Sequence, residues 1–395
     1  MATPSALEAQ EICDYICDFL HGSPTALTAC SLVSTVFTSS AQRHLFDHID
    51  LTDGTPDHPQ LGGPVMLRAG SNVVRASNRL RVVLEESPHL IRFIRCLKIS
   101  FDEEVLAHFT QVPLTHVETI VLRAPSQHHP HPNTVSSLAA PLIALPSVRN
   151  LKLILITFEH MESLRILTRQ RTSLFSQMSL HYVDVLQWPP MESIAGALQQ
   201  HIVVKELDMI GHQYKDSAWL IHPLSPFNFS TLERFNIQSL VMPSIVALMR
   251  LPGSTLHTLG IDAHEATTLF RLDDFIWLKD LDILGSINTV YRAAALLESA
   301  GSAELRLEHI IVRVCIMGLL DQDSLSRADD AIADMNSPHL RGVEFQMSMT
   351  TGPRSGLSSE RFVRMVKGVR EMLPRLNARG YLRVSCVYDG MCIDL

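Results

Sequence analysis

Short apolar segments with the composition of β-strands recur through most of this chain, and a helix-like stretch and a turn separate each from the next. Their starts lie roughly 20 to 40 residues apart, typically in the high twenties, which is a spacing found in repeat proteins. Alternating apolar residues mark them, as in LERFNI, LHTLGI, LKDLDIL and LRGVEF. The predicted strands are Cys96–Ser100, Glu118–Leu122, Asn150–Ile156, Gln177–His181, Glu206–Ile210, Glu233–Ile237, Leu256–Ile261, Leu278–Leu284, His309–Val314, Leu340–Phe345 and Tyr381–Val387.

A unit of this size cannot bury its own apolar face, so neighbouring units are expected to stack. The predicted fold class is therefore α/β, with a curved, mostly parallel sheet and helices on its outside across residues 49–395. The period resembles that of irregular leucine-rich repeats. Because the regular asparagine of such repeats is mostly missing, we expect an uneven solenoid. A conventional α/β sheet with right-handed crossovers is the alternative.

In residues 1–48 the apolar residues recur at helical spacing, which predicts three short helices. The sequence Ser5-Ala6-Leu7-Glu8 has the form of a capping box, and Gly22 is predicted to end the first helix in a left-handed conformation. Ser23-Pro24 is expected to start a second helix that includes Phe37, and Ser39-Ser40 a third. Residues 48–51 then alternate as in a strand, and residues 52–70 are predicted to form a flexible loop.

Three helices in fewer than fifty residues can bury only a thin core. Such a module either leaves apolar surface open to a partner or caps the repeats that follow it. The pattern alone favours neither interpretation.

The segment EICDYICDFLHGSPTALTACSLVSTVFTSSAQRHLFDHIDL, residues 11–51, resembles an F-box-like domain of the kind abundant in mushroom-forming fungi. The matching parts are Glu11-Ile12, Phe19-Leu20-His21, the ACSLVS helix at residues 29–34 and HLF at residues 44–46. The segment VLEESPHLIRFIRCLKI, residues 83–99, resembles the helix-to-strand segment that follows such boxes.

Two positions depart from the family's pattern. Glu8-Ala9 replaces a leucine-proline pair that in the family helps the box to dock, and Phe37 replaces the usual tryptophan. A charge in place of an apolar anchor would weaken docking if that position is buried in the interface.

The resemblance implies the substrate-recognition subunit of a cullin-RING (SCF-type) ubiquitin ligase. The box would bind a Skp-type adaptor subunit, and the repeats would hold a client protein that the sequence does not identify. The alternative is a repeat scaffold outside any ligase, with a degenerate box as its N-terminal cap. The residues expected in the core or docking face of the box are Glu11, Ile12, Ile16, Phe19, Leu20, Leu27, Leu32, Val33 and Phe37.

Composition and net charge limit the classes of partner that the chain is expected to bind. Apolar residues make up 46% of the 395 residues and charged residues 19%, enough for a substantial core. The net charge of −8 offers no general attraction for nucleic acid or anionic membranes, so neither is expected as a partner. Seven cysteines without a C-x-x-C pair, and an N-terminus without a secretory pattern, predict a cytoplasmic or nuclear protein.

Residues that suggest chemistry are few, and the chain is predicted not to be an enzyme and to carry no catalytic residues, cofactor or metal. The histidines at 128, 129 and 131 alternate with prolines and are expected in a loop. Cys13 and Cys17 are expected to act as small hydrophobic residues. Asp102 to Glu104 and Asp273-Asp274 are placed at strand or helix boundaries, where carboxylates at helix starts are common. A helix over residues 358–375 is predicted to have a basic outer face.

Overall fold

The computed structural model divides into two compact units, residues 1–202 with 223–227 and residues 203–222 with 228–395. The predicted α/β class, the mostly parallel sheet and the N-terminal helical region are confirmed. The structure describes residues 6–52, 67–68, 73–125, 130–131, 133–171, 174–189, 202–211, 217–238, 243–262, 271–286, 290–300, 303–316, 322–335, 337–349, 367–388 and 391–394.

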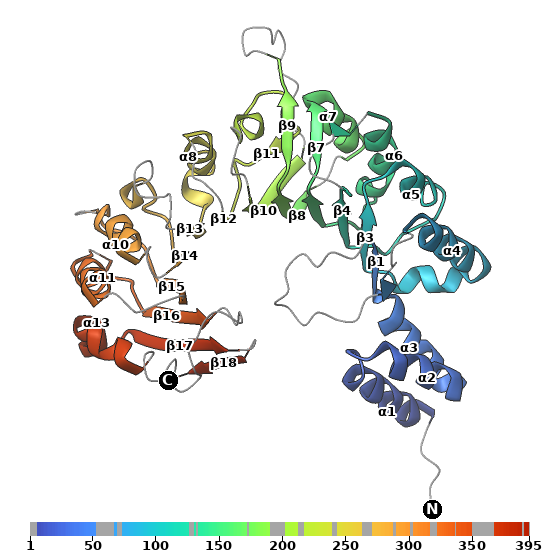
Figure 1. Cartoon of the computed structure of the whole chain (residues 1–395), viewed down its shortest axis with the longest axis horizontal. Helices are drawn as coiled ribbons and strands as arrows, with labels where there is room; N and C mark the ends of the chain where they lie inside the picture. Colours follow the sequence, from blue (N-terminus) through green and yellow to red (C-terminus); the bar gives the residue numbers. More distant parts are fainter. Residues whose placement is uncertain are drawn as a thin grey trace, which may run out of the picture. The chain divides into compact units, whose positions relative to one another are not determined.

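In the first unit, three helices precede strand β1, and strands then alternate with helices along the chain (Figure 1). The helical elements are α1 (Ala6–Phe19), α2 (Pro24–Val33), α3 (Thr35–Asp47), α4 (Val73–Glu86), η1 (Pro88–Phe93), α5 (Glu103–Ala107), α6 (Asn133–Ile143) and α7 (Met161–Thr168). The strands are β1 (His48–Leu51), β2 (Leu67–Arg68), β3 (Cys96–Ser100), β4 (Thr119–Arg123), β5 (Pro130–His131), β6 (Asn150–Ile154), β7 (Thr157–His160), β8 (Phe175–His181) and β9 (Asp184–Gln187).

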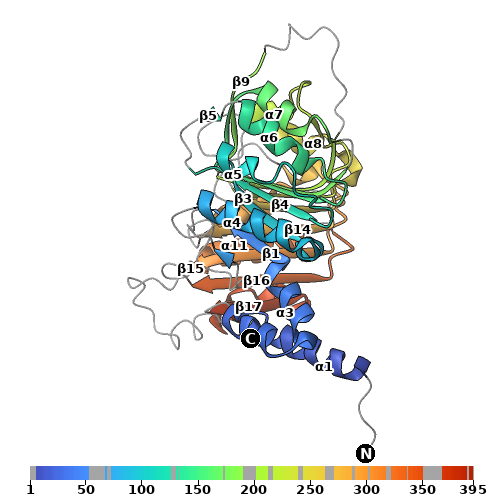
Figure 2. The same ribbon diagram turned by 90° about the vertical axis from the view of Figure 1, so that its right-hand side faces the viewer.

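The sheet of the first unit has the strand order β2-β1-β3-β4-β6-β8, and all of its neighbouring strands with a described register run parallel. Helices α4, α5, α6 and α7 lie along one face of it (Figures 1 and 2). The register places the apolar residues of successive strands in rows, so that Leu97, Ile120, Leu151 and Met178 stand side by side and are fully buried. Alternation along each strand sends the polar residues to the opposite face.

A second, three-stranded parallel sheet in this unit has the order β5-β7-β9. Leu155 separates β6 from β7, and Tyr182 separates β8 from β9; both have a positive φ, of 61° and 55°. The Leu155 N–H donates to the carbonyl oxygen of His181 over 2.8 Å, so the two bends are in register. The sequence did not predict this sheet, because neither bend carries the glycine that usually occupies a left-handed position.

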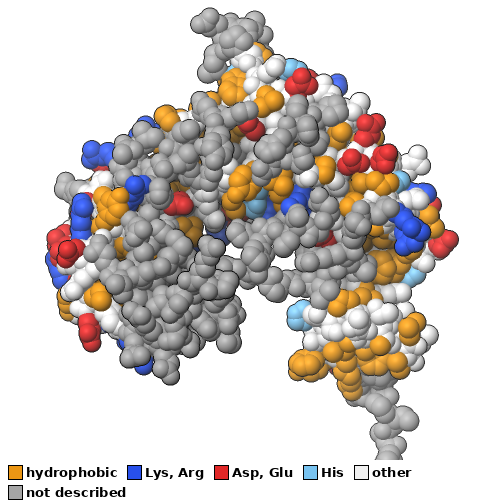
Figure 3. All heavy atoms as spheres, viewed as in Figure 1, with side chains coloured by type: hydrophobic (Ala, Val, Ile, Leu, Met, Phe, Trp, Pro, Cys, Tyr) orange, Lys and Arg blue, Asp and Glu red, His pale blue; other side chains and the backbone are white. Residues whose placement is uncertain are grey.

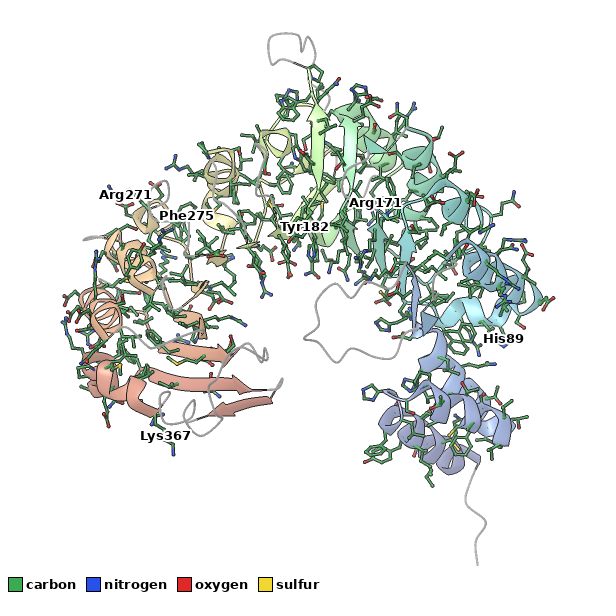
Figure 4. All side chains as sticks on the ribbon, in the orientation of Figure 1. His89, Arg171, Tyr182, Arg271, Phe275 and Lys367 are labelled. Carbon is green, nitrogen blue, oxygen red and sulfur yellow. The ribbon has the colours of Figure 1, made fainter. Side chains whose placement is uncertain are left out.

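Arg171 connects the end of α6 to the start of β8 (Figure 4). Its buried guanidinium donates to the carbonyl oxygens of Leu145 and Val148, over 2.7 and 2.5 Å, and to that of Leu174 over 2.9 Å. The guanidinium also lies 4.7 Å from the centre of the Phe175 ring. Burial lowers the pKa of Arg171 from its usual value. A fourth bond, to the carbonyl oxygen of Ile143 over 3.3 Å, satisfies the last carbonyl group of α6, which a helix end leaves without an intrahelical partner.

In the second unit, strands β10 and β12–β17 run parallel, and β18 pairs antiparallel with β17. The strands are β10 (Ile202–Ile210), β11 (Phe227–Asn228), β12 (Arg234–Gln238), β13 (Thr258–Asp262), β14 (Asp280–Ser286), β15 (His309–Ile316), β16 (Gly342–Met349), β17 (Leu382–Tyr388) and β18 (Met391–Asp394). The helical elements are η3 (Ser217–Leu220), α8 (Pro243–Arg250), η4 (Gly253–Thr255), η5 (Leu272–Asp274), α10 (Val290–Glu298), α11 (Gln322–Asp334) and α13 (Pro374–Ala378).

The second unit repeats the same packing. One row of the register joins residues that are all buried: Ile237, Ile261, Ile283, Val312, Phe345 and Val384. The buried carboxylate of Asp329 on α11 accepts the backbone N–H groups of Arg375 and Leu376, both over 2.9 Å. It thereby satisfies two donors in the first turn of α13, where no preceding residue caps the helix.

All eleven strands predicted from the repeat pattern overlap strands of the structure. Within the predicted loop 52–70, residues 67 and 68 instead form β2, because they pair parallel with Ile49 and Asp50; residues 53–66 and 69–70 lie outside the described residues. Of the predicted helix 358–375, residues 367–372 and 374–378 are helical, and the earlier part lies outside the described residues. In the described part, Lys367 and Arg370 are exposed and Val369 is buried.

Candidate docking surface on the N-terminal helices

The three N-terminal helices enclose a small core. Cys17 of α1, Leu27 of α2 and Ala41 of α3 are buried against one another at its centre. Partly buried side chains complete it: Leu20, Cys30, Phe37 and Leu45. Burial raises the pKa of the Cys17 thiol, in agreement with its predicted role as a small hydrophobic residue. The module uses few large side chains, and its core is correspondingly thin.

Two predicted boundaries of these helices were wrong. The third helix begins at Thr35 rather than Ser39, because extended Ser34 accepts the N–H of Val36 with its hydroxyl group over 3.2 Å and so caps α3. Phe37 therefore belongs to α3, not to the second helix. Gly22 does not have a positive φ; the first helix ends at Phe19, and the Ser23 N–H donates to the carbonyl oxygen of Leu20 over 2.8 Å. Ser5, the predicted cap of α1, lies outside the described residues.

Polar contacts tie α1 to α3. The Ser40 hydroxyl donates to the carboxylate of Asp14, and the Gln10 amide donates to both groups, over 2.9 Å to Asp14 and 2.8 Å to Ser40. These hydrogen bonds, the Ser40 bond foremost, lower the pKa of Asp14 below its usual value. One turn further along α1, Asp18 contacts Arg43 over 3.0 Å and His44 over 2.8 Å. The thin core is thus supplemented by hydrogen bonds and ion pairs at its edge.

The outer side of α1 and the end of α2 expose large apolar side chains to solvent, shown as orange side chains on the N-terminal module in Figure 3. Their exposed fractions run from 37% for Ile16 to 82% for Phe19 and Leu32. On α1 these side chains lie at spacings of three and four residues, which places them on one face. We call this set the α1–α2 apolar surface; its members are Ile12, Tyr15, Ile16, Phe19, Leu32 and Val33.

The structure thus divides the nine residues predicted for the box into two groups. Leu27 is buried, and Leu20 and Phe37 pack against the core, so these three build the module. Glu11 is exposed beside the apolar surface. The other five lie on that surface: Ile12, Ile16, Phe19, Leu32 and Val33. Tyr15 is not among the nine, but it lies on the same surface at helical spacing from Ile12 and Phe19. The side chains of Glu8 and Ala9 lie outside the described residues.

Scattered exposed apolar residues are normal on protein surfaces, but several large ones on one helix face are typical of an interaction site. In the α1–α2 apolar surface, four such residues share one face of α1, and two more are exposed at the end of α2. This arrangement can bury side chains against a protein partner.

Other residues singled out in the sequence have structural positions. Asp102 caps α5 by accepting the N–H of Glu104 over 3.0 Å, as predicted for a helix start, and Asp273 and Asp274 lie in η5. Cys13 and Cys17 are buried. Among the residues that the structure describes, no group of three or more His, Cys, Asp and Glu side chains is arranged to hold a metal ion. The histidines at 128 and 129 lie outside those residues, as does the side chain of His131.

Comparisons with known proteins add no relative. No protein-family model matches the chain, and no curated protein is significantly similar to it. In the described parts of the chain, the helices are too short or too polar to cross a lipid bilayer.

Proposed function

We propose that the chain is the substrate-recognition subunit of a cullin-RING ubiquitin ligase of the SCF type. Its F-box-like helices bind a Skp-type adaptor, and an irregular leucine-rich-repeat solenoid binds a client protein. The observation that carries the proposal is the α1–α2 apolar surface, where the residues that match the box motif are folded into a helical module and yet left exposed.

The energetics support a docking role. Burying one large apolar side chain contributes roughly 1.5–3 kcal/mol before the costs of association. Six such side chains are available on the surface, and two of them are aromatic, a class enriched among residues that dominate binding energies. The chain itself carries out no reaction in this proposal. It raises the local concentration of a client lysine near the conjugating enzyme.

The body of the chain supports the second half of the proposal. Each unit is a succession of strands in register with helices on one face, so the polar residues of neighbouring strands form a continuous surface on the other face. A protein segment can lie across several strands of such a surface. Binding of this kind does not require a deep pocket in either unit.

The test is binding of the purified full chain to a Skp-type adaptor, measured by isothermal titration calorimetry. Wild type is expected to bind at micromolar concentrations or below, and Phe19→Asp and Leu32→Asp are each expected to weaken binding at least tenfold. Val83→Asp is the control, because Val83 is an exposed apolar residue on α4, outside the N-terminal module. Absence of wild-type binding at micromolar concentrations would end the ligase proposal.

One observation favours a second function, a repeat scaffold outside any ligase with the helices as an N-terminal cap. Helix α3 packs against η1 and continues directly into β1, so the module is built onto the start of the sheet. In that case the adaptor does not bind, and Phe19→Asp leaves all partner binding unchanged.

A further inference from the structure

A cavity of about 390 Å³ lies in the first unit, at the carboxyl ends of two neighbouring strands of the three-stranded sheet. Strands β7 and β9 run parallel, with His160 opposite Gln187 at their ends (Figure 1). After His160 the chain turns at once into α7, whereas after Gln187 it continues without a helix through Trp188. Residues of both connections line the cavity. The crevice outside the carboxyl ends of parallel strands is a common place for ligands in α/β sheets.

The wall of the cavity is largely apolar. Met161 at the start of α7 is buried, and Trp188 and Leu224 are partly buried. An indole ring offers a flat surface on which another aromatic ring can stack, and a methionine side chain adapts to the shape of its neighbour. The volume falls at the lower end of the range for small-molecule sites. The cavity therefore fits a molecule of one or two rings.

The charged residues of the lining offer no net charge to a ligand. The Arg165 guanidinium lies 2.8 Å from the Glu162 carboxylate, and both residues line the cavity. The ring of His160 lies 3.7 Å from the carboxylate of its neighbour Glu159. A charged ligand would lose its hydration without gaining a counter-ion of its own, and this desolvation opposes binding. An uncharged ligand does not carry that cost.

Two polar groups of the lining are available for hydrogen bonds. The side-chain amide of Gln187 and the indole N–H of Trp188 have no partner among the residues that the structure describes. Gln187 is exposed and Trp188 is partly exposed. Together the two side chains offer N–H donors and one carbonyl acceptor. A primary amide attached to an aromatic ring presents the complementary set, which is an acceptor oxygen and N–H donors.

We propose that this cavity binds a small, uncharged aromatic molecule that carries an amide or a similar hydrogen-bonding group. The ring stacks on Trp188, and the polar group pairs with the amide of Gln187. The cavity shares no residue with the α1–α2 apolar surface, so this inference goes beyond the proposed function and does not depend on it.

The experiment titrates the full chain into three fluorinated probes and follows the widths of their fluorine NMR lines. The probes are 4-fluorobenzamide, 4-fluorobenzoate and 4-fluorobenzylamine, which share a ring and differ in charge at neutral pH. The amide is expected to bind with a Kd in the low millimolar range or below, and at least fivefold more tightly than either charged probe. Absence of amide binding at millimolar concentrations overturns the proposal, as does equal or tighter binding of a charged probe.

Two variants test the residues assigned to the ligand. Trp188→Ala is expected to weaken binding of the amide probe at least fivefold, and Gln187→Leu at least threefold. Trp277→Ala is the matched control, because Trp277 is also a tryptophan with part of its surface exposed next to a strand, but lies in the second unit; it is expected to change affinity less than twofold. If Trp188→Ala alters the circular dichroism spectrum, Gln187→Leu decides alone. An equal loss in the control overturns the proposal.

A third variant tests the argument from charge. Glu162→Gln removes the partner of Arg165 and leaves a positive charge uncompensated at the cavity. The preference for 4-fluorobenzamide over 4-fluorobenzoate is expected to fall at least threefold. An unchanged preference would contradict the inference that the paired charges make this a site for an uncharged ligand.

Discussion

The N-terminal helices and the sheet units use similar apolar residues in opposite ways. Along the strands, every second residue is turned toward the helices and fully buried, as Ile99 and Leu122 are. On α1 and α2, residues at equally regular helical spacing are exposed, and Phe19 shows 82% of its surface to solvent. Periodicity therefore predicts which residues share a face; it does not predict whether the protein itself covers that face.

The largest expected effect on stability comes from replacing one phenylalanine in each region by alanine. Phe101 is fully buried and packs edge-to-face on Phe158, with ring centres 6.1 Å apart. Phe101→Ala is expected to lower the free energy of unfolding of the first unit by about 3–5 kcal/mol, whereas Phe19→Ala should change it by less than about 0.5 kcal/mol. Urea denaturation followed by circular dichroism measures both. Similar losses in the two variants would contradict the comparison.

A second pair of substitutions compares the contributions of a buried and an exposed arginine to stability. Arg171→Met leaves buried carbonyl groups of the first unit without their donor and should cost about 3 kcal/mol. Arg43→Met removes only an exposed ion pair with Asp18 and should cost at most about 1 kcal/mol. Thermal unfolding of both variants at neutral pH provides the measurement. Greater damage from Arg43→Met would show that the module depends on its edge contacts more than on its core.

Acid should affect the N-terminal module through Asp14. Because hydrogen bonds from Ser40 and Gln10 lower its pKa in the folded chain, the carboxylate stabilises the fold above the usual value of 3.8. This contribution is lost as the pH falls below 3.8 through the lowered folded-state pKa. Hydrogen exchange of α1 at pH 5 and pH 3 should show weaker protection at pH 3, with a smaller difference in Asp14→Asn. An unchanged difference in that variant would exclude Asp14 as the cause.

The smallest effect concerns the bends between the two sheets of the first unit. Tyr182 has a φ of 55° and is 45% exposed, so little packing opposes its replacement. Tyr182→Gly should relieve backbone strain and stabilise the unit by about 0.5 kcal/mol after the entropy cost of glycine. The midpoint of urea unfolding reports the change. Tyr182→Ala serves as the control, because alanine keeps the strain, and it should not stabilise the protein.

The sequence pattern predicted those elements whose position is determined by neighbouring residues in the chain. Strands such as Cys96–Ser100 alternate clearly and were placed correctly, and Asp102 was assigned to a helix start by its charge and position. The bends at Leu155 and Tyr182 were missed because tertiary hydrogen bonds impose them on residues that do not favour a positive φ. The Asp329 cap of α13 was missed because 46 and 47 positions separate its carboxylate from the two donors.

The candidate docking surface was predicted in part. The box motif identified Phe19, Leu32 and Val33 together with Leu27, but it did not separate those that point outward from those that build the core. That separation depends on how three helices pack, which a linear motif does not describe. Three of the nine predicted residues are core residues.

The direct passage from α3 into β1 has a mechanical consequence. Asp47 ends the helix, His48 begins the strand, and the Arg95 N–H donates to the Asp47 carbonyl oxygen over 3.0 Å, so the junction has no spacer and is braced by the neighbouring connection. A partner bound to α1 and α2 is therefore connected rigidly to the first sheet. Anything bound to that sheet would be held in one orientation relative to the partner, and inserting a few glycines at the junction would replace the rigid connection with a flexible linker.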